Sequence, residues 1–168
     1  RDIPFAPLVP LLGFIVVVRF TRLHHRVFPL LRAGSLDRSI LPLLALVVVL
    51  SGVGLVAWFR FADPDFDGFR EMISQGQLGL IIAARLAFAV INAVIEEAIY
   101  RGVVQGILES AFGFTWFPLI VQAMVFGHVH FQGIMSGWSG VFLATAYGLL
   151  LGLMKRRGGG LAAPVLAH

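Results

Sequence analysis

The feature that most constrains this chain is a succession of apolar segments, each approaching the length needed to cross a bilayer. A helix needs roughly 20 mostly apolar residues to span the hydrocarbon layer. The candidate segments are residues 3–20, 40–59, 78–108, 116–131, 138–154 and 161–168. The sequence therefore predicts an all-α fold, a polytopic transmembrane helical bundle of about six membrane helices, the last of them truncated at the end of the chain.

The composition agrees with a bilayer environment and limits the available chemistry. Hydrophobic residues make up 58% of the 168 residues and charged residues only 13%, whereas about 25% of a soluble domain is charged. The chain has no cysteine, which excludes a disulfide, a thiolate nucleophile and a cysteine-bound metal. Any catalysis must therefore use Glu, His, Ser or Arg.

The charged residues indicate a topology and a class of partner. Basic clusters occur in "RFTRLHHRVFPLLRAG" and "KRRGGG", and acidic residues concentrate in the loop "RFADPDFDGFRE". Basic loops prefer the cytosolic side, so we expect a multi-pass protein of the cell (cytoplasmic or inner) membrane. The clusters lie between apolar runs and do not form one basic face, so we expect membrane lipid and no nucleic acid as a partner. The sequence does not indicate an oligomeric state.

Two adjacent glutamates interrupt the third apolar segment. Glu97 and Arg101 are four residues apart, so they share a helix face and can form an ion pair. Glu96 points about 100° away, on the face of Asn92 and Tyr100. A carboxylate without a cation inside a membrane segment usually faces a cavity or a functional partner, so Glu96 is a candidate general base. The alternative is that Glu96 lies in the headgroup region beside a purely structural ion pair.

The five histidines divide into three groups. We interpret His24 and His25, in the basic loop, as interfacial residues. His128 and His130 are two residues apart on a helix and point about 200° apart, so at most one of them faces the bundle. His168 follows the start of the last apolar segment, where an interfacial position is the alternative to a functional one.

Three short motifs occur in order on successive apolar segments. They are EExxxR from Glu96, FxxxH from Phe126 and APxxAH from Ala163. Together they resemble the CAAX prenyl protease and bacteriocin-processing family (CPBP, or Abi) of intramembrane proteases. The resemblance covers residues 78–168, so we interpret residues 1–168 as one membrane-embedded domain. Within it, residues 1–77 form two N-terminal helices with their loops, and residues 78–168 form the protease core.

The resemblance implies an intramembrane endopeptidase that acts on a membrane-associated protein or peptide. By position, Glu96 and His130 activate a water molecule, His168 stabilises the oxyanion, and Glu97 with Arg101 orients the site. The family pattern has an Asn four residues after its last histidine, but this chain ends at His168 and begins without Met. We therefore expect a fragment of a longer protein, and its activity in isolation is open.

A metal-dependent reaction is the alternative within the same family. The sequence has no HExxH zinc motif, but Glu96, His130 and His168 could supply one carboxylate and two imidazoles to zinc. We favour the glutamate-dependent reaction without a cofactor, because a carboxylate and a neutral imidazole can together remove the proton of a water molecule.

Two further functions compete with this interpretation. The stretch "GWSG" resembles a motif of the rhomboid serine proteases, with Ser139 as nucleophile and His168 as its base; otherwise Ser139 is a helix cap. A non-proteolytic bacteriocin-immunity or transport protein, in which Glu96 relays protons, is the third interpretation.

For the favoured protease, the sequence does not distinguish three substrate classes: a prenylated CAAX tail, a bacteriocin leader and a sorting signal.

Overall fold

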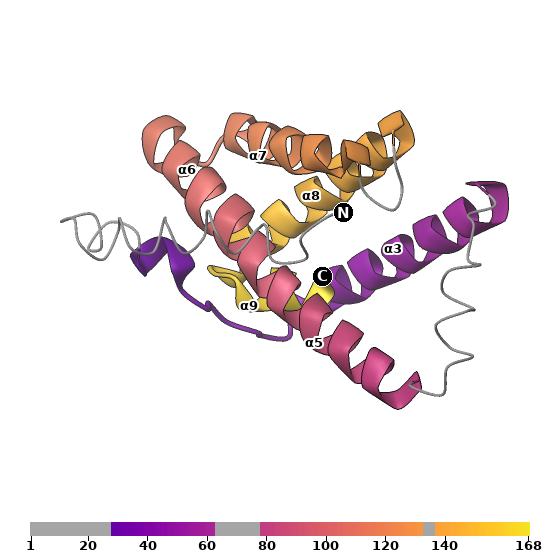
Figure 1. The fold of residues 1–168 in the computed structure, drawn as a ribbon. Helices are drawn as coiled ribbons and strands as arrows, with labels where there is room; N and C mark the ends of the chain where they lie inside the picture. Colours follow the sequence, from indigo (N-terminus) through magenta and orange to yellow (C-terminus); the bar gives the residue numbers. More distant parts are fainter. Residues whose placement is uncertain (1–27, 63–77, 133–136) are drawn as a thin grey trace, which may run out of the picture.

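The computed structural model describes residues 28–62, 78–132 and 137–168, which are drawn in colour in Figure 1. Within these ranges every regular element is a helix, which confirms the predicted all-α fold. The elements are η1 (Phe28–Leu31), α3 (Leu41–Ala62), α5 (Leu78–Glu97), the π-helix η2 (Ala98–Gln105), α6 (Gly106–Phe112), α7 (Trp116–Val129), η3 (His130–Gln132), α8 (Gly137–Gly158) and α9 (Ala162–Ala167).

Three of the described helical stretches are long and apolar enough to cross a membrane. They are Leu41–Phe61, Gly79–Phe112 and Gly137–Gly158, which match the second, third and fifth predicted segments. Helix α7 has 14 residues, a length of about 21 Å, so it is shorter than the hydrocarbon layer. The segment 3–20, His24 and His25, and most of the acidic loop lie outside the described residues. The number of about six spans stays a prediction.

The outer surfaces of α3 and α5 indicate whether the protein is surrounded by water or by lipid. Large aliphatic side chains are strongly exposed on both helices, including Val56 at 67% and Leu80 at 70%. A continuous apolar surface of this kind is unfavourable in water and is typical of a surface covered by lipid. Together with the three long apolar helices, it identifies a membrane protein.

Helix α8 is the centre of the bundle, because it contacts α3, α7, α9, η2 and η3. Its glycines allow the close approach. A Cβ atom on Gly152 would lie 2.7 Å from Gln122 Nε2 and 2.8 Å from Leu119 Cδ2. Small residues commonly permit such contacts between membrane helices. In Figure 1, α7 lies alongside α8 and α5 passes in front of α9.

An extended segment before α3 holds the turn that leads into α9. Three backbone hydrogen bonds join the two segments: Ser35 N to Gly158 O at 2.8 Å, Leu161 N to Arg32 O at 3.0 Å, and Ala162 N to Ala33 O at 2.8 Å. The backbones cross so closely that a Cβ atom on Gly160 would collide with the backbone of Ala33 and Gly34. This crossing fixes the position of α9 and therefore of His168.

Candidate active site

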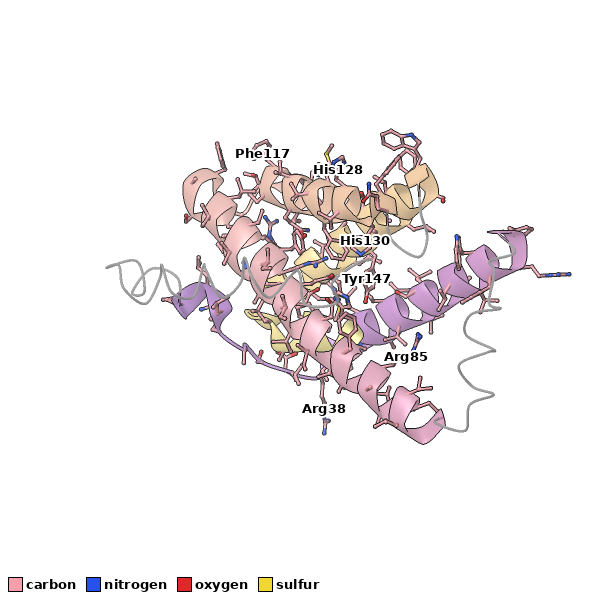
Figure 2. The ribbon with its side chains drawn as sticks, viewed as in Figure 1. Arg38, Arg85, Phe117, His128, His130 and Tyr147 are labelled. Atoms are coloured by element: carbon pink, nitrogen blue, oxygen red, sulfur yellow. The ribbon has the colours of Figure 1, made fainter. Side chains whose placement is uncertain are left out.

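The predicted site residues come from four parts of the chain. Glu96 and Glu97 end α5, Arg101 lies in η2, His130 caps α7, and His168 follows α9. Figure 2 shows His130 and Tyr147 near the middle of the bundle and His128 on the outer side of α7. His128 is exposed and His130 is half-buried, so only one of the two histidines faces the bundle, as the helix geometry predicted.

The ion pair predicted between Glu97 and Arg101 is present and fully buried. Arg101 Nη1 donates to Glu97 Oε1 at 2.9 Å, and both side chains are 0% exposed. Arg101 Nη2 also donates to Gly148 O at 3.4 Å, and its guanidinium carbon lies 4.2 Å from the centre of the Phe126 ring. The arginine is thus held by a carboxylate, an α8 carbonyl and an aromatic face, contacts that offset the cost of burying its charge.

His168 joins the two glutamates. Its Nδ1 lies 2.9 Å from Glu97 Oε1, and its Nε2 lies 3.4 Å from Glu96 Oε2. Glu96 Oε1 accepts a hydrogen bond of 3.0 Å from Asn92 Nδ2, whereas Oε2 has no hydrogen-bond partner. Glu96 is therefore oriented from one side by an amide, with its second oxygen directed at an imidazole. Its side chain is 21% exposed, so most of its surface is covered by protein.

The hydrogen bond of His130 fixes the tautomer of its neutral ring. Nδ1 lies 2.8 Å from the carbonyl oxygen of Phe126. A carbonyl oxygen only accepts, so Nδ1 must carry the proton and Nε2 is left as an acceptor. The imidazoles of His130 and His168 both contact Phe126, with ring centres 4.6 Å and 6.2 Å from its own. Both imidazoles thus pack against Phe126, and the one that lies 3.4 Å from a Glu96 oxygen is that of His168.

Both imidazoles line a cavity of about 730 Å³ between α3, α7 and α8. Most of its other walls are aliphatic and come from α3 and α8, among them Leu50, Leu55 and Leu143. A site for small or extended ligands typically combines such apolar walls with a few polar groups at one end. The arrangement can hold an apolar chain with its polar part beside the two histidines.

The matched family agrees with these motifs. Residues 77–168 match the family model described as type II CAAX prenyl endopeptidase Rce1-like. The chain belongs to this family. The match spans all three motifs and confirms the resemblance found in the sequence. No curated protein and no solved structure matches the chain. Membership in the CAAX endopeptidase family supports the general activity of an intramembrane protease.

Tyr147 is a site residue that the sequence reasoning missed. Its hydroxyl donates to Ala167 O at 2.7 Å, and its ring centre lies 5.8 Å from that of His168. It therefore packs against the candidate site from α8 and holds the last turn of α9. A single tyrosine within an apolar helix could have indicated a functional position in the sequence. Tyr147 is 20 residues from Ala167, however, so no local spacing predicted this hydrogen bond.

The π-helix was also missed. The reasoning from 100° per residue assumed a regular α-helix through Arg101, but η2 begins directly after Glu97. Short π-helical stretches occur frequently at functional sites. Within this stretch Arg101 and Gln105 both donate to α8 carbonyls, of Gly148 and Gly152, while the contact between Glu97 and Arg101 is preserved.

The rhomboid alternative does not fit the surroundings of His168. In that alternative an imidazole nitrogen must accept the hydroxyl proton of Ser139. Both nitrogens of His168 face carboxylate oxygens, of Glu96 and Glu97. Ser139 lies in the first turn of α8, about 12 Å along the helix axis from Tyr147. The matched family is a CAAX prenyl endopeptidase family and not a rhomboid family.

The zinc alternative would need Glu96, His130 and His168 to converge on one point. Over residues 28–62, 78–132 and 137–168, no three His, Asp or Glu side chains are arranged to hold a metal ion.

Proposed function

We propose that the chain is a glutamate-dependent intramembrane endopeptidase. In this proposal, Glu96 and His130 activate a water molecule and His168 stabilises the oxyanion. The observation that carries it is Glu96 Oε2, which accepts no hydrogen bond and lies 3.4 Å from Nε2 of His168, an imidazole that lines the apolar cavity together with His130. The proposal places all 168 residues in one membrane domain with residues 78–168 as its protease core, in the cytoplasmic membrane.

The proton balance of the first step follows from these groups. The water gives its proton to Glu96 Oε2 or to His130 Nε2, and its oxygen attacks the carbonyl carbon of the scissile bond. Proton transfer of this kind contributes about 10²–10⁴-fold to a rate. The same proton then passes to the leaving nitrogen as the carbon–nitrogen bond breaks, which returns the base to its starting form.

His168 is suited to donate to the oxyanion because Glu97 supports its charge. Nδ1–H donates to Glu97 Oε1, and a protonated ring then has a second N–H at Nε2. With His168 protonated, the charges of Glu96, Glu97, Arg101 and His168 cancel, which lowers the cost of burying them together. One donor aimed at an oxyanion is worth roughly 3 kcal/mol of transition-state stabilisation.

The substrate we propose is a prenylated C-terminal peptide. Two observations support an apolar substrate chain: the aliphatic walls of the cavity near His130 and His168, and the match to a CAAX prenyl endopeptidase family. A bacteriocin leader and a C-terminal sorting segment are the competing substrate classes. They are distinguished by product analysis with one peptide of each class.

The test is cleavage by the full chain reconstituted in lipid vesicles. Mass spectrometry of the products identifies the bond that is cut, and initial rates are compared for Glu96→Gln, Ser139→Ala and Asp37→Asn. We expect Glu96→Gln to lower the rate by about 10²-fold or more. Ser139→Ala and the exposed control Asp37→Asn should stay within about twofold, a change of only ~0.4 kcal/mol. Full activity of folded Glu96→Gln would disprove the proposal, and loss in Ser139→Ala would support the serine protease instead.

A further inference from the structure

A second cavity lies apart from the two histidines. It has a volume of about 330 Å³ and shares no lining residue with the cavity at His130 and His168. Its walls come from η1 and the residues after it, from α6 with the turn that follows, and from the end of α8. The assignment of the active site gives this cavity no role.

The charge of this cavity is strongly asymmetric. Three cationic side chains line it, Arg32, Lys155 and Arg156, against one carboxylate, Glu109. Such an excess of positive charge attracts an anion. Basic pockets between membrane helices are suited to anionic groups at the bilayer surface, and the basic residues here end the membrane helix α8.

Glu109 holds two of the cations in place without using all of their donors. Lys155 Nζ and Arg156 Nε both donate to Glu109, the latter at 2.7 Å. Arg156 also donates to the carbonyl of Thr115 at 2.6 Å. An ammonium group has three N–H donors, so Lys155 keeps donors for a ligand. Because Glu109 already orders these side chains, a ligand would pay less of the entropy cost of fixing them.

Arg32 completes the cavity from a distant part of the sequence. Its carbonyl accepts from Leu161 N at 3.0 Å, which anchors it beside the end of α8. Its Nη2 lies 3.9 Å from the position that a Cβ atom on Gly159 would take. The side chain is exposed, so its planar set of N–H donors is accessible to a bidentate anion such as a phosphate group.

We propose that this cavity binds a phosphate group, with Arg32 and Lys155 as the donors to its oxygens. The group can come from the headgroup of an anionic phospholipid or from free phosphate. The proposal is independent of the proteolytic mechanism, because neither donor contacts Glu96, His130 or His168.

The test uses native mass spectrometry of the full chain in a neutral detergent. The probes are dioctanoyl phosphatidylglycerol, dioctanoyl phosphatidylcholine and inorganic phosphate. The variant is Arg32→Gln, and the matched control is Arg38→Gln, which removes the same charge from the same segment. Arg38 is exposed and does not line the cavity, and Figure 2 shows it pointing away from the helices. Circular dichroism checks that both variants keep their helix content.

We expect Arg32→Gln to weaken binding of the anionic lipid by about tenfold, the effect of losing a charge-assisted hydrogen bond. Arg38→Gln should change it by less than about twofold. If inorganic phosphate competes and depends on Arg32 in the same way, the ligand is free phosphate; if it does not compete, the ligand is the lipid headgroup. An equal loss in both variants indicates diffuse attraction to the basic surface and overturns the proposal, as does unchanged binding in Arg32→Gln.

Discussion

Two ionic clusters lie along the same helical stretch, one around Glu96 and Glu97 and the other around Glu109. They differ in how many of their carboxylate oxygens accept a hydrogen bond. Both oxygens of Glu109 have partners: Gln105 at 2.8 Å and Arg156 at 2.7 Å on Oε1, and Lys155 on Oε2. In the first cluster, Oε2 of Glu96 and Oε2 of Glu97 have no hydrogen-bond partner.

On the proposed mechanism, this difference separates a cluster that stabilises the fold from one that takes part in proton transfer. A carboxylate whose lone pairs are occupied by fixed cations is a poor proton acceptor, whereas a buried oxygen without a donor is costly unless a function retains it. The comparison predicts that substitutions in the Glu109 cluster affect stability with little effect on catalysis, and that Glu96 shows the opposite behaviour.

The largest effect is expected where the first cluster loses its buried cation. Arg101→Leu leaves the carboxylate of Glu97 buried without its main partner, a change that typically costs about 3–5 kcal/mol. We expect a large fall in the temperature of unfolding, measured in detergent by circular dichroism. The double variant Glu97→Gln, Arg101→Leu should recover part of this loss, because it removes the orphaned charge. No recovery would show that Arg101 acts mainly through its contacts with Gly148 and Phe126.

A moderate effect is expected in the second cluster. Glu109→Gln removes the negative charge that pairs with Lys155 and Arg156 and leaves a single amide oxygen as acceptor. The side chains of Lys155 and Arg156 are 13% and 15% exposed and can turn to water or lipid headgroups. We expect a loss of about 1–2 kcal/mol in the free energy of unfolding and a proteolytic rate within about twofold of the parent. The comparison between the clusters fails if this variant loses activity to the same extent as Glu96→Gln while it remains folded.

The smallest effect is expected at Tyr147. Tyr147→Phe keeps the ring beside His168 but removes the hydroxyl that donates to Ala167 O, at a cost of about 0.5–1.5 kcal/mol. If the tyrosine positions His168, kcat should fall while KM changes little, because the cavity wall is unchanged. The measurement is a comparison of kcat and KM on the cleaved peptide. Equal thermal stability together with unchanged kcat would assign Tyr147 to packing alone.

Much of the local structure around the site could be predicted from the sequence. The apolar segments gave the positions of α3, of the stretch from α5 to α6, and of α8, because helix formation and membrane length depend on short-range patterns. The spacing of Glu97 and Arg101 predicted their ion pair, and the two-residue spacing of His128 and His130 predicted that only one faces the bundle. The three motifs predicted the family.

Contacts between distant segments could not be predicted in this way. The family resemblance implied that Glu96 and His130 share one water molecule, but the sequence could not show that His168 contacts both glutamates. That position depends on α9, which the crossing of the backbones near Gly34 and Gly160 holds in place. The partnership of Glu109 with Lys155 was equally hidden, since 46 residues separate them.

The sequence by itself therefore determined that this chain is helical, lies in a membrane and carries the motifs of a protease family. These properties follow from composition and from spacings within a few helical turns, where backbone geometry fixes which side chains are neighbours. Only the tertiary structure decided which carboxylate has a hydrogen-bond partner on both oxygens, which imidazole contacts both glutamates and where the two cavities lie. Those features depend on how closely the glycines of α8 and of the turn before α9 let separate segments approach, and no local periodicity encodes that distance.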